Sequence, residues 1–282
     1  MNLDALQFSP GAYLAPAVDW LNMNFHPFFD GIARLIEAVL GSIEAVLLYP
    51  PPYAAIMVAV LLAAFFVGVR VAMVTAIALI FCLLAGFWAA SMQTLALVAT
   101  ATILALIVGI PIGIVAGFAK AFDNALEPVL DLIQTMPPYI YLLPAIALLG
   151  YGPATALVAT VIVAMPPAIR LTSLGIRMTP NEFIELGQAT GLTPWQMFTK
   201  IRLPFAIPSI MAGINQSLMM AFGMVVIAGI VGSGGLGETI YGAVRTLDIA
   251  TSINAAIAIV ILIMVLDRLT QSAADSAKAG AR

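Results

Sequence analysis

Residues 71–119 read VAMVTAIALIFCLLAGFWAASMQTLALVATATILALIVGIPIGIVAGFA and contain no Asp, Glu, Lys or Arg over 49 positions. A helix that crosses the hydrocarbon core of a bilayer needs about 20 residues, so this run must hold two such helices. Uncharged runs of 25, 38 and 35 residues also occur at 45–69, 132–169 and 203–237. The runs are continuous rather than alternating, which weighs against a β-barrel. The sequence therefore predicts an all-α, polytopic membrane helix bundle.

The composition excludes the soluble classes of protein. Of the 282 residues, 62% are hydrophobic and 9% are charged, whereas soluble domains hold roughly 45–50% apolar and about 25% charged residues. So few charges could not cover the surface of a soluble enzyme, and disordered chains are polar and charged. With one cysteine, Cys82, and one histidine, His26, neither an intrachain disulfide nor a metal site is expected. The pI of 5.0 argues against nucleic acid as a partner, and no cleavable signal peptide is predicted.

Seven spans are expected, and the loops between them carry charge unevenly. The expected spans are 53–69, 72–90, 94–118, 129–149, 154–174, 205–231 and 250–267. If they alternate in direction, most basic residues fall on one side, namely Arg70, Lys120, Arg170, Arg177, Lys200, Arg202, Arg268, Lys278 and Arg282. Only Arg34 and Arg245 fall on the other side. Because Lys and Arg collect in cytoplasmic loops, we expect the N-terminus outside and the C-terminus in the cytoplasm.

The transmembrane domain, 53–268, is flanked by an N-terminal segment, 1–52, and a cytoplasmic tail, 269–282. Within the first segment, residues 27–48 read PFFDGIARLIEAVLGSIEAVLL. Four charged residues recur there among apolar ones at helical spacing: Asp30, Arg34, Glu37 and Glu44. The pattern predicts an amphipathic helix that lies in the membrane interface or packs on the outer face of the protein. The three prolines at 50–52 end this helix.

Two glycine motifs lie within or beside the spans. Gly109, Gly113 and Gly117 repeat at every fourth residue in GIPIGIVAG, a spacing that lets helices approach closely. Close packing is the favoured interpretation, with gating as the alternative. The second motif, VGSGGLG at 231–237, cannot continue a helix without cost. It predicts a hinge or an extracellular gate, or else a plain tight turn, at four positions: Gly232, Gly234, Gly235 and Gly237.

The segment QTMPPYIYLLPAIALLGYGP, residues 134–153, interrupts an apolar run with Pro137, Pro138 and Pro144. The bilayer core tolerates a broken helix only beside protein or a water-filled cavity. We therefore favour a span that lines a transport pathway, with a structural kink as the alternative. The candidate lining residues are Gln134, Met136, Pro137, Tyr139 and Tyr141. Two polar residues of a later span, Asn215 and Gln216, either line the same path or hold helices together.

The loop TPNEFIELGQATGLTPWQMFTKIRLP, residues 179–204, is the most informative segment between spans. Thr179 with Glu182, and Thr193 with Gln196, fit two capping boxes, and Gly191 fits the turn that ends the first helix. The loop thus predicts two short helices with apolar side chains such as Phe183, Leu186 and Trp195 on one face. Such a face suits the groove of a partner protein, or else the loop folds back onto the membrane surface.

The loop resembles the cytoplasmic signature of permeases from binding-protein-dependent ABC importers: E-A-A, three residues, G, nine residues, I-x-L-P. Glu185 is followed six residues later by Gly191, and Ile201, Leu203 and Pro204 complete the pattern at the family's spacing. Leu186 and Gly187 stand in place of the two alanines. The resemblance implies that this loop contacts an ATPase. The implied coupling residues are Glu182, Phe183, Glu185, Leu186, Gly187, Gly191, Trp195, Ile201, Leu203 and Pro204.

Residues 130–271 look like the permease subunit of importers for glycine betaine, proline betaine or choline, as in LDLIQTMPPYIYLLPAIALLGYGP and AMPPAIRLTSLGIR. The resemblance implies a type I ABC importer permease in a bacterial inner membrane, serving osmoprotection. It also implies two permease chains, two ATPase chains and an external substrate-binding protein. The substrate would be a quaternary ammonium compound, and ATP and Mg would bind to the partner ATPase, because this chain has no G-x-x-x-x-G-K-[ST] loop.

Alternative functions remain open at this point. A methionine-type permease would share the signature loop and the GGLG segment. A secondary transporter or channel would need no ATPase, but such proteins often place ionisable residues within spans, and here they lie near the ends. A membrane-embedded enzyme is not expected, because the chain lacks a cluster of catalytic side chains.

Overall fold

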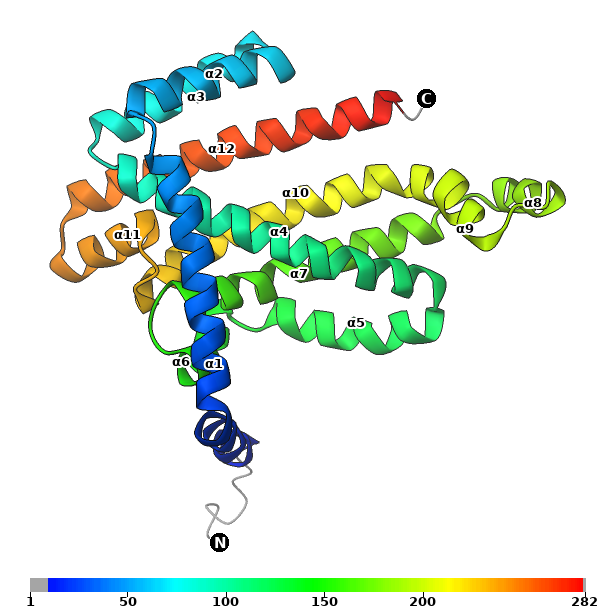
Figure 1. Ribbon diagram of the computed structural model, residues 1–282, viewed down its shortest axis with the longest axis horizontal. Helices are drawn as coiled ribbons and strands as arrows, with labels where there is room; N and C mark the ends of the chain where they lie inside the picture. Colours follow the sequence, from blue (N-terminus) through cyan, green and yellow to red (C-terminus); the bar gives the residue numbers. More distant parts are fainter. Residues whose placement is uncertain (1–9, 281–282) are drawn as a thin grey trace, which may run out of the picture.

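The computed structural model describes residues 10–280 and the side chains of 15–272, and throughout these residues the chain forms helices and turns without β-strand. The centre is a bundle of α4 (Trp88–Phe118), α7 (Pro153–Arg177) and α10 (Leu203–Ala228). Helix α12 (Ile249–Gly280) runs beside them (Figure 1). The all-α helix bundle predicted from the sequence is confirmed.

Small residues bring the three central helices close together. A methyl group added at Gly113 of α4 would lie 2.6 Å from the Ile169 carbonyl oxygen of α7. One added at Gly117 would lie 2.7 Å from Ile176, also on α7. The glycine repeat therefore packs α4 against α7, as the spacing predicted.

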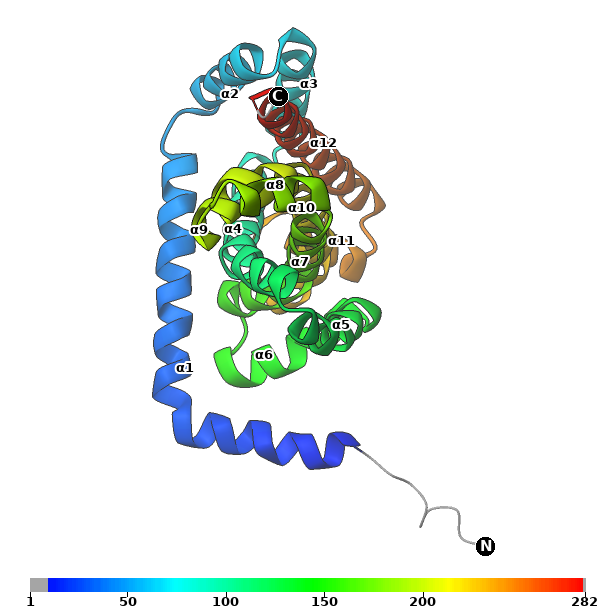
Figure 2. The same ribbon diagram turned by 90° about the vertical axis from the view of Figure 1, so that its right-hand side faces the viewer.

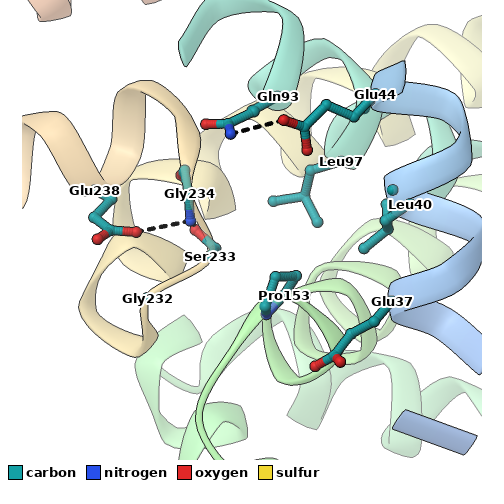
Figure 3. Close-up of a pocket in the computed structure, with 12 residues that line it drawn as sticks. Glu37, Leu40, Glu44, Gln93, Leu97, Pro153, Gly232, Ser233, Gly234 and Glu238 are labelled. Atoms are coloured by element: carbon teal, nitrogen blue, oxygen red, sulfur yellow. Dashed lines mark hydrogen bonds between the residues drawn. The ribbon is translucent and has the colours of Figure 1, made fainter. Parts of the chain in front are cut away.

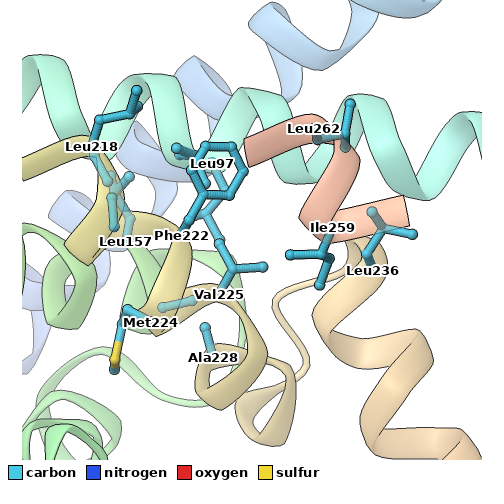
Figure 4. Packing of buried hydrophobic residues seen from close by; sticks show 14 of the residues in the cluster. Leu97, Leu157, Leu218, Phe222, Met224, Val225, Ala228, Leu236, Ile259 and Leu262 are labelled. Atoms are coloured by element: carbon cyan, nitrogen blue, oxygen red, sulfur yellow. The ribbon is translucent and has the colours of Figure 1, made fainter. Parts of the chain in front are cut away.

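The buried core lies where the central bundle meets α12. Large side chains from four helices interlock there, and Figure 4 shows several of them: Leu97, Leu157, Leu218, Phe222, Val225 and Leu262. Phe222 is almost fully buried. Burying a side chain of this kind is worth about 1.5–3 kcal/mol in water, whereas inside a bilayer close packing supplies the stabilisation.

The prediction of seven spans is not confirmed. Among the described residues, four helices are long and apolar enough to cross a membrane, or up to six if each of two bent pairs counts as one span. The predicted span 72–90 is wrong as one helix, because α3 (Val69–Leu84) ends before Gly86 and α4 then begins at Trp88. Gly86 has φ +77°, a conformation that interrupts a helix. Apolar composition continues across this turn, so hydropathy alone cannot locate it.

The span 129–149 is broken, as its prolines predicted. It divides into α5 (Lys120–Thr135) and a second arm made of η2 (Pro138–Tyr141) and α6 (Leu142–Leu149), which meet at 105°. Met136 at the break is extended, with φ −70° and ψ 140°. A residue before proline is pushed out of the helical region, so Pro137 fixes the bend.

Helix α1 (Pro10–Leu48) is longer than the predicted segment 27–48 and bends at Phe25, whose φ is −122°. It crosses the bundle at a steep angle, and the chain then turns by 91° into α2 (Pro52–Phe66) (Figures 1 and 2). Ala33 and Leu40 are buried, whereas Leu35 and Val46 are exposed. One face of α1 thus packs on protein, which agrees with packing on the outer face of the bundle, and a position in the membrane interface stays a prediction.

Two of the predictions concern the ends of the chain. Residues 1–9 and 281–282 lie outside the described residues, and so does the predicted external position of the N-terminus. The segment 269–282 was expected to be a tail after the last span, but α12 continues as a helix to Gly280.

Candidate functional site

Two short helices project from one end of the bundle and form the predicted signature loop (Figures 1 and 2). They are α8 (Asn181–Ala189) and α9 (Pro194–Met197), and a π-helical turn, η3 (Phe198–Arg202), joins α9 to α10 without a break. The second capping box is confirmed, since Thr193 and Gln196 exchange both hydrogen bonds. The first is wrong: Pro180 is the N-cap, and the Thr179 hydroxyl donates instead to the Ile176 carbonyl.

Gly191 forms the turn between the two helices, as its position in the signature predicted. Its φ is +71°, a left-handed conformation that glycine adopts without strain. Its N–H donates to the Gln188 carbonyl, and the Leu192 N–H donates to the Gly187 carbonyl, both at 3.0 Å. These bonds satisfy carbonyl groups at the end of α8 and fix the direction in which the chain leaves it.

The loop presents apolar side chains to the outside. Trp195 is 71% exposed, Leu186 is 58% exposed, and Phe183 is exposed to a smaller extent. Glu182 and Glu185 are exposed beside them, so the surface is apolar with an acidic border. Large exposed side chains gathered on two helices outside a membrane bundle suit a protein partner.

The remaining signature residues join the loop to the spans. Gly187 is buried, and a methyl group there would lie 2.6 Å from the end of Met197 and 2.8 Å from the end of Ile201. Ile201, Leu203 and Pro204 are half-buried where η3 continues into α10. Gly187 thus lets α8 lie directly on the segment that becomes a span.

Aromatic contacts that the sequence analysis did not single out strengthen this connection. The rings of Phe183 and Phe205 lie 4.8 Å apart and join α8 to the start of α10. Phe198 contacts Phe118 at the end of α4, at 5.9 Å, and the Arg202 guanidinium lies 4.9 Å from the Phe118 ring. The loop therefore contacts both α10 and α4. In the sequence, these contacts were indicated only by the Phe residues near the ends of the loop.

The structure separates the roles of the two tyrosines on the broken span. The Tyr141 hydroxyl donates to the Ile133 carbonyl at 3.0 Å, so it caps carbonyl groups left free where α5 ends. Tyr139 is 56% exposed and its hydroxyl is not used in this way. Gln134 at the end of α5 and Pro137 after the break are also exposed, and Met136 is half-buried.

The later polar pair does not join this group. The Asn215 side-chain oxygen accepts a hydrogen bond from the Thr270 hydroxyl at 2.9 Å, which links α10 to α12. Gln216 is exposed on α10. Of the two alternatives for Asn215, the contact with Thr270 favours holding helices together.

The second glycine motif is tightly packed at the opposite end of the bundle, between α10 and α11 (Gly235–Thr246). Gly232, Gly234 and Gly235 all have φ between +74° and +76°. Gly237 is buried so closely that an added methyl group would overlap the Val225 carbonyl oxygen. This packing favours a tight turn over a freely moving hinge.

Polar groups from α1 and α4 hold this glycine turn in place. Gln93 Nε2 donates to Glu44 Oε1 of α1 at 2.8 Å (Figure 3). Gln93 Oε1 in turn accepts from the Gly235 N–H at 2.9 Å. The Thr94 hydroxyl accepts from the Leu236 N–H. A pocket of about 250 Å³ lies beside these groups and is also lined by Glu37 and Glu238 (Figure 3). These contacts could have been suspected from the sequence, because Gln93 and Thr94 form a polar pair within the 49-residue uncharged run.

No group of three or more His, Cys, Asp or Glu side chains within the described part of the chain could hold a metal ion.

Comparison with known proteins gives one family match and several relatives. The family described as "Binding-protein-dependent transport system inner membrane component" matches residues 109–275, more than half of the chain. The glycine betaine transport system permease protein OpuAB of Bacillus subtilis is 44% identical, over 90% of each chain. The glycine betaine/proline betaine permease protein ProW of Escherichia coli is 39% identical over 96% of this chain and 77% of that protein. The glycine betaine/carnitine permease protein GbuB of Listeria monocytogenes is 39% identical, over 95% and 99%.

Solved structures share the fold. An inward-facing MetNI methionine ABC transporter superposes with a TM-score of 0.60 at 22% identity, covering 70% of this chain and 96% of that chain. A second crystal form of the same transporter gives a TM-score of 0.57 at 24% identity, covering 67% and 93%.

Proposed function

The chain belongs to the family of binding-protein-dependent transport system inner membrane components, and we propose that it carries a quaternary ammonium osmolyte across the bacterial inner membrane as the permease of an ATP-driven importer. The observation that carries this proposal is the loop at 179–204, whose apolar helices leave the bundle and continue directly into α10. Glycine betaine is the first candidate substrate, because relatives that share 39–44% identity over most of the chain are glycine betaine permeases. Proline betaine and choline are the next candidates.

The ATPase is a separate chain that binds the exposed face of α8 and α9. This chain itself catalyses no reaction, and ATP and Mg bind to the partner. Closure of the ATPase would press on Leu186 and Trp195, which lie outermost in the loop. The contact of Gly187 with Met197 and Ile201 would pass that force to α10. The pathway would then alternate between inward-open and outward-open states.

Two copies of the chain enclose the pathway, and an external binding protein delivers the substrate. Gln134 and Tyr139 support the dimer, because they lie exposed on the surface of a single chain and need an opposing chain to close the path. The only cysteine, Cys82, is buried, so engineered cysteines can be cross-linked selectively. Gln134→Cys should cross-link between copies, whereas Leu247→Cys, on the outer loop, should not. The reverse result would contradict this arrangement.

Tyr139 is the residue of the broken span that we expect to contact the substrate. A quaternary ammonium group is attracted to an aromatic face, an interaction worth about 0.5–2 kcal/mol, or roughly 2- to 30-fold in affinity. Tyr139→Ala should therefore weaken uptake by a factor in this range, while Tyr139→Phe keeps the ring and should transport normally. Uptake by Tyr139→Ala at the wild-type rate would remove Tyr139 from the path.

The orientation is N-terminus outside and C-terminus in the cytoplasm, as the distribution of basic residues supports. Single cysteines at Gln188 on α8 and at Leu247 on the outer loop test it in whole cells. A membrane-impermeant maleimide should label Leu247→Cys and should leave Gln188→Cys unlabelled until the cells are opened.

The central test is assembly with an ATPase. The chain should co-purify with its partner ABC ATPase, and the reconstituted complex should hydrolyse ATP faster when binding protein loaded with glycine betaine is added. Stimulation by methionine instead would identify a methionine-type permease. Uptake by the chain alone, without an ATPase, would identify a secondary transporter or channel and overturn the proposal.

A further inference from the structure

Two arginines differ from the other described arginines in having no partner. Among the residues whose side chains the structure describes, five arginines contact a carboxylate or an aromatic ring: Arg34 with Asp30, Arg170 with Asp131, Arg177 with Asp123, Arg202 with Phe118, and Arg245 with Tyr241. Arg70 and Arg268 have neither kind of contact within that same part of the chain. Both side chains are exposed, so their guanidinium groups are accessible to a ligand from outside the chain.

Arg70 and Arg268 line the same groove, although 198 positions separate them in sequence. The groove has a volume of about 540 Å³ and lies where α3 packs beside α12. Its remaining wall is Val71, Val74 and Met264, with one carboxylate from Asp267. Asp267 is already used in part, because its Oδ2 accepts a hydrogen bond from Gln271.

The chemistry of the groove matches one end of an amphiphile. Two guanidinium groups against one carboxylate leave a net positive charge, and guanidinium pairs well with phosphate. The apolar wall begins directly beside the charges, as the acyl chains of a lipid would require. A soluble anion would gain nothing from that wall, whereas a lipid satisfies both parts of the groove.

The surroundings place the groove in contact with lipid. Helix α2, which pairs with α3, exposes a stripe of large apolar side chains, Met57, Leu61 and Phe65, as a lipid-facing helix does. The turn between α2 and α3 and the C-terminal half of α12 both point toward the end of the bundle that carries α8 and α9 (Figure 1). In the proposed orientation, the groove therefore opens at the cytoplasmic leaflet, where anionic lipids meet basic pockets between helices.

We propose that the Arg70–Arg268 groove binds the phosphate headgroup of an anionic phospholipid of the cytoplasmic leaflet, with its acyl chains along Val71, Val74 and Met264. The inference goes beyond the proposed function, because it depends on the chain lying in a membrane in the proposed orientation and not on what it transports. The bound phosphate balances the net positive charge of Arg70, Asp267 and Arg268, and the lipid joins the α2–α3 hairpin to α12.

The test measures lipid retention by the purified full-length chain. The protein in mild detergent is titrated with a short-chain phosphatidylglycerol, and bound lipid is counted by native mass spectrometry. Near a membrane surface each basic residue contributes about 1 kcal/mol, so each Arg→Gln change should weaken binding roughly fivefold. R70Q/R268Q should lose about 25-fold, and Asp267→Asn, which removes the opposing charge, should strengthen binding. Arg245→Gln, a matched change outside the groove, should leave binding unaltered.

Two further titrations identify the ligand as a lipid. Phosphatidylcholine of the same chain length should bind weakly, and glycerophosphoglycerol, which has the headgroup without acyl chains, should not displace phosphatidylglycerol at equal concentration. Equal retention by R70Q/R268Q and wild type, equal binding of both lipids, or displacement by the free headgroup would each overturn the proposal. If the double variant does not survive purification, Asp267→Asn and these wild-type titrations still decide, since unchanged or weaker binding by Asp267→Asn contradicts it.

Discussion

Gly191 offers the sharpest test of how the loop is coupled to the spans. Its φ of +71° lies in the left-handed region, and its N–H donates to the Gln188 carbonyl. Proline fixes φ near −65° and has no N–H, so Gly191→Pro must open the turn and lose that hydrogen bond. Proline where it does not fit costs about 3 kcal/mol or more, and a factor of ten corresponds to about 1.4 kcal/mol. The native turn should therefore become roughly 100-fold less populated relative to an open loop.

Two milder substitutions at the same position make the prediction quantitative. Alanine at a left-handed position costs about 1–2 kcal/mol, whereas asparagine tolerates that conformation better than other side chains. Coupling should thus decrease in the order Gly, Asn, Ala, Pro. If the turn acts only through its shape, Gly191→Asn should keep most of the activity.

The assay compares substrate uptake with ATP hydrolysis in vesicles that contain the complete importer. Gly191→Pro should leave basal ATP hydrolysis measurable. Because the native turn would be populated about two decades less, the amount of substrate carried per ATP should fall to a few per cent of the wild-type value. A wild-type ratio for Gly191→Pro would refute the coupling role of the turn. Equal damage from Asn and Pro would show that glycine is needed for some reason other than its backbone conformation.

Three further predictions follow from contacts elsewhere. Gly113→Ala should lower the melting temperature, because the new methyl group would lie 2.6 Å from the Ile169 carbonyl oxygen and overpacking costs about 1–3 kcal/mol; Gly223→Ala, which meets no atom within 4 Å beyond its own helix, should not lower it. Tyr141→Phe should destabilise the protein by about 0.5–1.5 kcal/mol in chemical denaturation, because its hydroxyl donates to carbonyls at the end of α5, and an unchanged midpoint would exclude this cap. Hydrogen bonds from Thr251 lower the pKa of the Asp248 carboxyl. The ionised carboxylate therefore stabilises the start of α12 fully above the ordinary Asp pKa, and this stabilisation is lost as the pH falls through the lowered pKa. Hydrogen exchange in the first turn of α12 should accelerate across that pH range, and Asp248→Ala should abolish the dependence.

Local rules were sufficient for the signature loop. The capping box at Thr193 and the left-handed turn at Gly191 each depend on residues within a few positions, so they can be predicted from sequence. The same rules gave the wrong cap at Thr179, because α8 begins one residue later, with Pro180 as its N-cap, and the Thr179 hydroxyl donates to the Ile176 carbonyl of the preceding helix. The pattern of residue types did not fix which of these two neighbouring positions starts the helix.

Contacts between distant segments could not be predicted in this way. Nothing near Asn215 in sequence indicates Thr270, and nothing near Gln93 indicates the Gly235 N–H, since helix packing decides which polar groups meet. The span boundaries failed for a related reason. Hydropathy measures how apolar a segment is, but the break at Gly86 depends on backbone conformation within an apolar run. The break at Met136 could be predicted, because Pro137 and Pro138 follow it directly.

The charges on α5 indicate where the transporter can move. Asp131 pairs with Arg170, and Asp123 pairs with Arg177 while also accepting from the Ser173 hydroxyl, so α5 is tied to α7 at two levels. Helix α7 in turn packs closely along both α4 and α10. A force applied at α8 and α9 should therefore rotate these helices together rather than separate them. In the proposed dimer, such a rotation would place the moving boundary between the two copies of the chain, where the exposed Tyr139 would face the substrate.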